Sequence, residues 1–381
     1  MLLAKYPSSQ IPAPQFFAPF SDLGSGAASL VLSAGSGSAT FSRASQAAAR
    51  LSTGLWKLDV ASGTARGHYL PNLVYGGVFI EDAATQLVTP AASVRDLTNV
   101  AWAKTANMLA AKTSTGVDGA ANSCTRLTAN GAGNQTILQT LAAASTQRTL
   151  SFFIKRITGS GNIDITTDNG GTWTTLTGIG GVSFSQLSIT TTVLNPIFGL
   201  RIVTNGDAID VDCAQYEAGG MPTSPIPAAG TRSADSLSYT AANLNATVGT
   251  MFCQMYVEWL VNASGGSNCV AGVDSAQLGG FGGSGPDSSF MSDGVQFANQ
   301  TSIDNCSSNI RKRASNWKAT GSIMGTTGAG FPAATNTFAG SMGSGGALYV
   351  GSLSGANTFL NGTVLNLKTW NTFLDVAKLT A

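Results

Sequence analysis

The sequence predicts an all-β protein with two β-sandwich (jelly-roll) domains in tandem and an extended N-terminal arm. Charged residues make up only 10% of the 381 residues, where about a quarter is usual for a soluble domain. Gly, Ala, Ser and Thr stand where exposed helices would carry Glu, Lys and Arg. Short segments of alternating apolar and polar residues recur about every 8 to 12 residues, which is typical of a sandwich. The length fits two or three domains of about 100 to 200 residues each.

Residues 1–40 are rich in Pro, Ala, Ser and Gly and have little periodicity. Their aromatic residues include Phe16, Phe17 and Phe20. Such a segment buries too little apolar surface to offset about 1 to 2 kcal/mol of backbone entropy per residue, so we expect an arm that becomes ordered on a neighbouring surface. Residues 41–96 hold short strand-like pieces and are predicted to form a β-rich connecting region.

Regular strand signals predict a jelly-roll domain over residues 97–220. In TLSFFIKRI (149–157), every second residue from Leu150 to Ile154 is apolar, as expected for a strand with one buried face. Turn residues such as those of TNGD (204–207) separate the strands.

A proline-rich stretch follows this domain. MPTSPIP (221–227) lacks three backbone donors and disfavours α conformation before each proline, so we predict a Pro-rich linker over residues 221–235. Strand alternation then resumes and predicts a second sandwich over residues 236–381. A fragment of residues 228–381 is therefore expected to fold alone.

Several blocks of the sequence carry a resemblance to a known family. The blocks are ATFSRAS (39–45), GGVFIEDAATQL (76–87), NVAWAK (99–104) and VDCAQYEAGGMPTSPIPAAGTRSAD (211–235). Together they resemble bacteriophage tail-fibre and head-fibre proteins that carry a carbohydrate-binding-type jelly roll. The chain departs from the family pattern at Gln86, where the family favours Asn.

The C-terminal part carries a second resemblance. The segments GALYVGSL (346–353) and FLNGTVLNLKTWN (359–371) make it similar to a concanavalin A or laminin-G type sandwich. Both resemblances describe strands and turns, and neither names a ligand.

The first resemblance implies a virion protein, a tail or head fibre engaged in attachment to the host. Our hypothesis is that it attaches to the host surface by non-covalent glycan binding. The arm over residues 1–40 would anchor it to the particle. Its partners would be capsid, portal or tail proteins and the host surface polysaccharide, and it would be assembled in the host bacterial cytoplasm. The alternative is an architectural protein that decorates the capsid or joins tail parts without binding glycan.

The residue inventory predicts that the chain is not an enzyme and has no catalytic residue. Its one histidine, His68, would have to serve any Ser-His-Asp or Cys-His system, and we expect it to cap a turn or stack on a ring instead. Glycoside hydrolysis needs two carboxyl groups about 5 to 10 Å apart. Glutamate occurs only at positions 81, 217 and 258, and the pair Asp210 and Asp212 is expected to form a solvated strand face or a calcium-binding edge.

Two tryptophans are the candidates for ligand binding. Trp173 ends TTDNGGTW (166–173), which matches the Asp-box turn of sialidases and other β proteins. In that turn Asp168 can accept backbone hydrogen bonds and the glycines permit positive φ, so a structural role is predicted. Trp317 lies beside the basic residues of NIRKRASNWK (309–318). Aromatic faces of this kind can stack on sugar rings.

The composition also bears on metals and partners. The five cysteines are scattered without a CxxC pair, which predicts buried free thiols, and neither a metal site nor a cofactor is predicted. A structural calcium ion is the one ion left open. The net charge of +1 favours association, so we expect a homo-oligomer, with a trimer as the first form to test. We expect no nucleic-acid binding and no membrane span.

Overall fold

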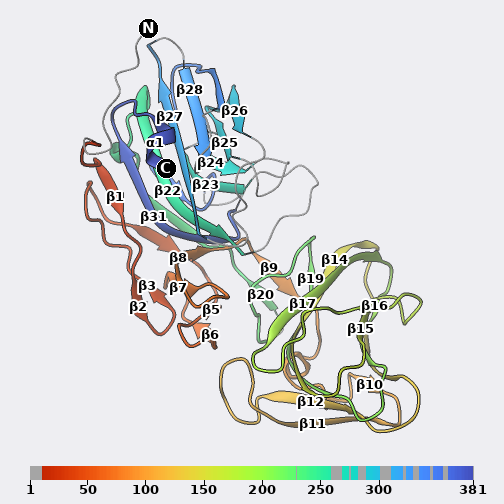
Figure 1. The fold of residues 1–381 in the computed structure, drawn as a ribbon. Coiled ribbons are helices and arrows are strands. Elements are labelled where there is room, and N and C mark those ends of the chain that lie inside the picture. The colour runs from red at the N-terminus through yellow and green to blue at the C-terminus, as the bar shows by residue number, and fades with distance from the viewer. Residues whose placement is uncertain are drawn as a thin grey trace. The chain divides into compact units, whose positions relative to one another are not determined.

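The computed structural model divides into two compact units, each assembled from separate stretches of the chain (Figure 1). Unit 1 contains residues 1–44, 62–82 and 234–381, and unit 2 contains residues 45–61 and 83–233. The structure describes residues 11–228, 230–258, 268–273, 276–281, 289–300, 310–320, 323–328, 334–343, 346–354 and 359–380.

The all-β class is confirmed. In the described ranges the α-helical part is α1 (Val376–Thr380), and short 3-10 turns occur at Ala91–Val94 and Ala241–Asn243. Nearly all the remaining regular structure is antiparallel β-sheet. The polar and small residues that replace helix-forming side chains in the sequence therefore lie on strands and in turns.

Unit 1 is a sandwich of two sheets whose strands come from all three of its chain segments. The ten-stranded sheet runs in the order β2 (Asp22–Gly24), β3 (Ala27–Ala28), β7 (Arg66–Tyr69), β8 (Tyr75–Ile80), β31 (Gly362–Trp370), β22 (Val248–Val257), β27 (Arg311–Lys318), β28 (Ile323–Gly328), β29 (Ala334–Thr337), and β1 (Phe16–Ala18) also pairs with β31. The seven-stranded sheet runs in the order β26 (Phe297–Gln300), β25 (Ser289–Ser292), β24 (Ala276–Phe281), β23 (Asn268–Val273), β30 (Ala347–Val350), β21 (Ser236–Thr240), β4 (Thr40–Ser42).

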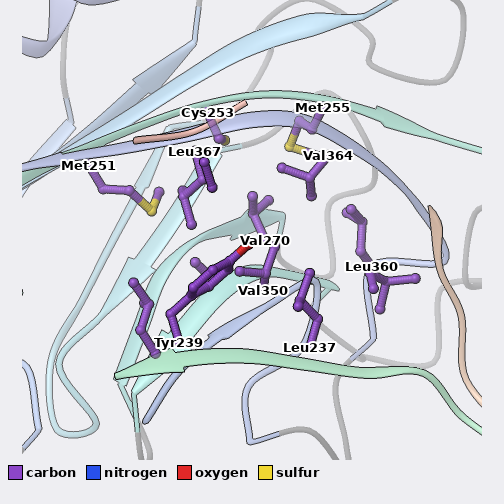
Figure 2. Packing of buried hydrophobic residues seen from close by; sticks show 14 of the residues in the cluster. Leu237, Tyr239, Met251, Cys253, Met255, Val270, Val350, Leu360, Val364 and Leu367 are labelled. Carbon is purple, nitrogen blue, oxygen red and sulfur yellow. The ribbon is translucent and has the colours of Figure 1, made fainter. Parts of the chain in front are cut away.

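Apolar side chains from the two sheets meet in the core of unit 1 (Figure 2). Leu237 and Tyr239 of β21 lie on one side of this core, and Met251 and Cys253 of β22 lie on the other. The alternation that the sequence shows in β22 therefore marks the face that is buried in the core. The close packing of two such faces is the main favourable term in the folding of this unit.

The predicted N-terminal arm is wrong for its described residues. Phe16 pairs with Thr369 in β31, and its ring lies 5.2 Å from that of Tyr239 in an edge-on arrangement. Phe16 and Phe20 are 0% and 2% exposed, so they belong to the core of unit 1. A strand of three residues is too short to show periodicity, and its partner strand lies at the other end of the sequence.

The other predicted boundaries also differ from the structure. Residues 41–96 are divided between the two units, and residues 236–381 form a sandwich only together with strands from the first 82 residues. β4 pairs with β21, and β8 pairs with β31. The two sandwiches are therefore interleaved in sequence, because strand partners close the sheets across long sequence separations.

Unit 2 also contains two main sheets. Its five-stranded sheet runs in the order β10 (Ala103–Lys104), β13 (Gln135–Thr140), β18 (Ile197–Ile202), β15 (Ile163–Thr166), β16 (Thr174–Thr175). The other sheet runs in the order β11 (Met108–Ser114), β12 (Cys124–Ala129), β19 (Ala208–Ala218), β14 (Thr146–Thr158), β17 (Ser185–Val193), with β9 (Ala84–Gln86) and β20 (Gly230–Arg232) joined to it. Phe152, Phe198 and Val211 lie in the core of this unit.

A hairpin formed by β5 (Ala47–Arg50) and β6 (Trp56–Val60) packs on the outer face of the sheet that contains β14 and β19. The Trp56 ring meets Phe153 edge-on at 5.6 Å, and the Trp56 backbone N–H donates to the carbonyl of Val117 at 2.8 Å. Residues 208–217 of β19 are buried on both faces of their strand.

This burial corrects the expectation of a solvated face at Asp210 and Asp212. Asp210 accepts hydrogen bonds from Arg126 Nε at 2.9 Å and from Ser114 Oγ at 2.8 Å. Asp212 Oδ1 accepts one from Arg95 Nε at 2.8 Å. Both carboxylates are compensated by arginine inside unit 2, as buried charges require.

The predicted linker over residues 221–235 is wrong, because most of it is packed into unit 2. Thr223 and Ser224 are 7% and 0% exposed. Glu217 accepts hydrogen bonds from the Thr223 backbone N–H at 2.8 Å and from Thr223 Oγ1 at 2.7 Å. Arg232 donates to Ser224 Oγ at 3.1 Å. The prolines shape a loop that polar residues on both sides hold in place.

Cys124, Cys213 and Cys253 are buried thiols that are not part of a disulfide bond, which confirms the prediction for these three. Burial raises the pKa of Cys124 to about 12 and that of Cys213 well above its ordinary value. Thiols with raised pKa values are poor nucleophiles. The side chains of Cys269 and Cys306 lie outside the part of the chain that the structure describes.

Candidate functional site

The outer face of the five-stranded sheet in unit 2 is the candidate site. Apolar residues at alternate positions, such as Ile137, Ile165 and Leu200, point from this sheet into the core. The residues between them therefore lie on the opposite face. On that face Thr136 is half-buried and Thr175 is exposed.

A row of polar residues crosses four strands of this face. Thr136 of β13 pairs with Arg201 of β18, Arg201 pairs with Asp164 of β15, and Asp164 pairs with Thr175 of β16. Figure 1 shows β15 and β16 side by side at the end of this row. Directly paired residues on one face of a sheet are close enough to interact, so the register brings these four side chains together.

Asp164 is the fixed centre of the row. Its Oδ2 accepts hydrogen bonds from Arg201 Nε at 2.8 Å and Nη2 at 2.5 Å, and its Oδ1 accepts one from Thr175 Oγ1 at 2.7 Å. Asp164 is 1% exposed, whereas the Arg201 side chain is 22% exposed. The guanidinium is thus held in one orientation and still reaches the surface.

Trp173 lies on the Arg201 side chain. The guanidinium carbon of Arg201 is 4.5 Å from the centre of the indole ring, within the range of a cation–π interaction. Trp173 is half-buried. The sequence singled out this residue as a ligand-binding candidate, and the structure places it beside a fixed ion pair on an outer sheet face.

The Asp-box turn positions Trp173. Asp168 Oδ1 accepts hydrogen bonds from the Thr172 backbone N–H at 2.9 Å and from Thr166 Oγ1 at 2.7 Å. Burial alone would raise the pKa of Asp168, but these hydrogen bonds outweigh it and the pKa is lowered. Asn169 and Gly170 have φ values of 59° and 80°. The predicted structural turn is therefore confirmed in its hydrogen bonds and its backbone.

The indole is packed tightly against this turn. A Cβ atom added to Gly170 would lie 2.7 Å from Trp173 Nε1, which is closer than side-chain atoms approach. The Asn169 backbone N–H also donates to the carbonyl of Ile197 at 2.9 Å, which fastens the turn to β18. The turn and the ion pair together limit the rotamers of Trp173, so the indole is held in one orientation.

The second candidate, Trp317, is wrong as a ligand-binding residue. It is 0% exposed, and its Nε1 donates to the carbonyl of Asn245 at 2.9 Å in unit 1. A Cβ on Gly249 would lie 2.4 Å from the indole, so the ring fills the space above that glycine. Trp317 lies on β27, which pairs on both sides in the ten-stranded sheet. It is a core residue despite the basic residues next to it.

The residues considered for acid–base chemistry lie outside the five-stranded sheet: His68, Glu81 and Glu258 are in unit 1, and Glu217 is on the other sheet of unit 2. His68 is 0% exposed and stacks on Phe79 at 4.2 Å, as the stacking interpretation expected, with its Nε2 3.7 Å from Glu258 Oε2. Glu81 is 0% exposed and accepts a hydrogen bond from Arg66 Nη1 at 2.7 Å. Burial raises the pKa of Glu217 to about 7.

Sequence reasoning missed Arg201 and Asp164. Each is a charged residue at an outward position of an otherwise apolar strand, in IFGLRI (197–202) and IDIT (163–166). The pattern can be seen in each strand by itself. To know that the two residues are neighbours, however, one needs the register between strands that lie more than thirty positions apart in the sequence. Opposite charges at outward strand positions are the signal that could have found them.

The described ranges hold neither a cluster of metal-binding side chains nor a membrane-spanning helix. No group of three or more His, Cys, Asp or Glu side chains among them is placed to hold a metal ion. Within the same ranges, none of the helices has the length and apolar character needed to cross a bilayer.

Comparison with known proteins gave weak similarities. No protein-family model matches the chain, and no curated protein matches its sequence. Among solved structures, the N-terminal CBM22-1-CBM22-2 tandem domain of Paenibacillus barcinonensis Xyn10C aligns over 77% of this chain and 99% of its own, with 12% identity and a TM-score of 0.28. The extracellular region of zebrafish Gpr126/Adgrg6 aligns over 66% of this chain and 35% of its own, with 10% identity and a TM-score of 0.23. Superpositions with TM-scores this low support no conclusion about this chain.

Proposed function

We propose that this chain is a non-enzymatic glycan-binding protein and that the outer face of the five-stranded sheet in unit 2 is its binding face. One observation carries the proposal. Trp173 is half-buried and contacts both an Asp-box turn and the Arg201–Asp164 ion pair, on a sheet face that also carries the exposed residue Thr175. A fixed aromatic side chain with hydrogen-bonding groups next to it is suited to a sugar, which offers C–H groups on its faces and hydroxyl groups around its rim.

The Arg201 guanidinium supports the same proposal. Its Nε and Nη2 atoms donate to Asp164. The guanidinium has five N–H donors, so others remain to donate to a hydroxyl group or a ring oxygen of a sugar. Since the ion pair with Asp164 already fixes the Arg201 guanidinium, this side chain loses little further conformational entropy when a ligand binds.

We place this activity in a bacteriophage fibre that attaches to the host surface. The proposal rests on the sequence blocks that resemble tail-fibre and head-fibre proteins, together with the low charge of the chain. A single site of this size would bind weakly, so several copies on one particle would supply avidity. Deletion of the protein from virions should lower adsorption to the host. An altered particle with unchanged adsorption would favour the architectural role instead.

The proposal includes the absence of hydrolysis. The burial of Glu81 and Glu217 supports it, because a general acid must reach the glycosidic oxygen. Incubation of the purified chain with host polysaccharide should release no new reducing ends. Release that is lost in a single Asp or Glu variant would contradict this part of the proposal.

Glycan binding by a Trp173→Ala variant tests the proposed site directly. Loss of the indole should weaken binding at least about ten-fold, which corresponds to about 1.4 kcal/mol. Isothermal titration with a glycan that binds the unaltered chain gives the measurement. Melting temperatures of both proteins should agree within a few degrees, since Trp173 is half-buried on an outer sheet face and does not belong to the core of unit 2.

A matched control exists within unit 2. Phe184 is also a half-buried aromatic residue with a cation above its ring, Lys155 Nζ at 4.9 Å, but it does not lie on the five-stranded sheet. Phe184→Ala should leave glycan affinity unchanged. Equal weakening by both substitutions would mean that the effect is a general loss of structure, and an unaffected Trp173→Ala variant would remove this face as the site.

A further inference from the structure

The charges on the five-stranded sheet indicate which class of glycan it accepts, given the function proposed above. Lys104 and Arg201 are the cationic residues of its five strands, and Asp164 is the acidic one. The Lys104 ammonium donates to the backbone carbonyls of Trp102 at 2.8 Å and Leu97 at 3.1 Å. Lys104 pairs with Ile137, whose side chain is in the core, so the lysine belongs to the opposite side from the candidate face.

The positive charge of Arg201 is already compensated. Its Nε and Nη2 atoms both donate to Oδ2 of Asp164, which is 1% exposed. The neighbouring turn adds a second carboxylate, that of Asp168, whose lowered pKa keeps it ionised. The candidate face and its turn therefore hold two carboxylates and one guanidinium.

We infer that the glycan bound at Trp173 is neutral, without carboxylate or sulfate groups on the sugar unit in contact with the indole. An acidic sugar would place its charge beside the Asp164 carboxylate and lose hydration without gaining an uncompensated cation. The hydroxyl groups of a neutral sugar need single donors and acceptors, which the free N–H groups of Arg201 and the oxygen atoms of Thr136 and Thr175 provide.

A glycan array with equal numbers of neutral and acidic glycans tests this inference on the full chain. Neutral glycans should supply the hits, and the affinity for the best hit should change less than about two-fold between 50 mM and 500 mM NaCl, because no net charge is neutralised. Hits mainly among uronic acid, sialic acid or sulfated glycans, with strong weakening by salt, would overturn the inference while leaving glycan binding intact. An array without hits would count against the proposed function itself.

Asp164→Asn supplies an independent readout. The substitution leaves Arg201 uncompensated, so binding of carboxylated glycans should appear and should weaken at least about five-fold over the same salt range. Asp59→Asn is the control, because it removes one negative charge from a side chain of unit 2 that is 60% exposed. Unchanged selectivity in a folded Asp164→Asn variant would overturn the inference. If the Asp164→Asn variant has a lower melting temperature than the Asp59→Asn control, the salt dependence of glycan binding by the unaltered chain tests the inference in its place.

Discussion

At the scale of single residues, the buried carboxyl group of Glu217 makes the stability of unit 2 depend on pH. Burial raises its pKa to about 7 from the ordinary value of 4.5, although Gln215 Nε2 and both donors of Thr223 donate to it. The folded state therefore binds this proton more tightly than the unfolded state does. The resulting stabilisation is full below pH 4.5 and is lost as the pH rises through about 7.

Glu217→Gln should remove this pH dependence. The amide oxygen can accept the bonds from Gln215 and from the Thr223 backbone, and the amide nitrogen can donate to Thr223 Oγ1. The melting temperature of the unaltered chain should fall between pH 5 and pH 8 by more than that of the variant. Scanning calorimetry at both pH values measures the difference. Parallel pH profiles would show that Glu217 does not titrate in this range.

At the scale of structural elements, the Asp-box turn makes a testable connection between backbone and site. Gly170→Ala should destabilise unit 2 by about 1 to 2 kcal/mol because the residue has positive φ. It should also weaken glycan binding, since the new methyl group would displace Trp173.

Gly133→Ala separates these two effects. Gly133 has a φ of 78°, close to the 80° of Gly170, but a Cβ there would meet nothing within 4 Å. Both variants should lose stability in denaturant titrations, Gly170→Ala the more because of its clash with Trp173, and only Gly170→Ala should lose affinity. Equal affinities would mean that the turn does not position the indole.

Strands with regular alternation could be predicted from the sequence, and elements defined by distant partners could not. In β14 the predicted core residues Phe152 and Ile154 are buried as expected. Phe153, at an outward position, is also buried, because a hairpin from residues 45–61 covers that face. Nothing in the local sequence of β14 indicates this cover.

In the candidate site, too, the local features could be predicted from the sequence and the contacts between distant segments could not. The Asp-box motif is local, so its turn and the place of Trp173 in it followed from eight consecutive residues. The partners Arg201 and Asp164 depend on strand register, and the burial of Trp317 depends on β27 being a central strand. Long-range pairing is the information that a single sequence lacks.

At the scale of the whole molecule, a buried charge cluster ties together the three chain segments of unit 1. Arg43 Nη1 donates to Asp235 Oδ1 at 2.9 Å, Arg66 Nη1 donates to Glu81 Oε2 at 2.7 Å, and Arg66 Nη2 also donates to Asp235. These residues lie near the points where the chain leaves or re-enters the unit, at 44/45, 61/62, 82/83 and 233/234. Removal of one partner from such a cluster leaves a buried charge without compensation.

The fragment 228–381 is therefore predicted not to fold alone, contrary to the expectation from sequence. It lacks β1, β4 and β8, and it leaves Asp235 without Arg43 and Arg66. Circular dichroism should show no cooperative melt for this fragment. A chain in which residues 45–61 are joined to 83–233 by a Gly/Ser linker should melt cooperatively, because it holds all of unit 2. A cooperative melt of 228–381 would contradict the interleaved architecture.

The central claim is that a neutral glycan binds the outer face of the five-stranded sheet through Trp173 and Arg201. A crystal structure of the full chain with the best glycan from the array tests it most directly. The account predicts a sugar ring in van der Waals contact with the Trp173 indole, with one of its oxygen atoms accepting a hydrogen bond from Arg201 while the Arg201–Asp164 pair stays intact. A sugar bound only in unit 1 or on another face of unit 2, with Trp173 uncontacted, would contradict the account.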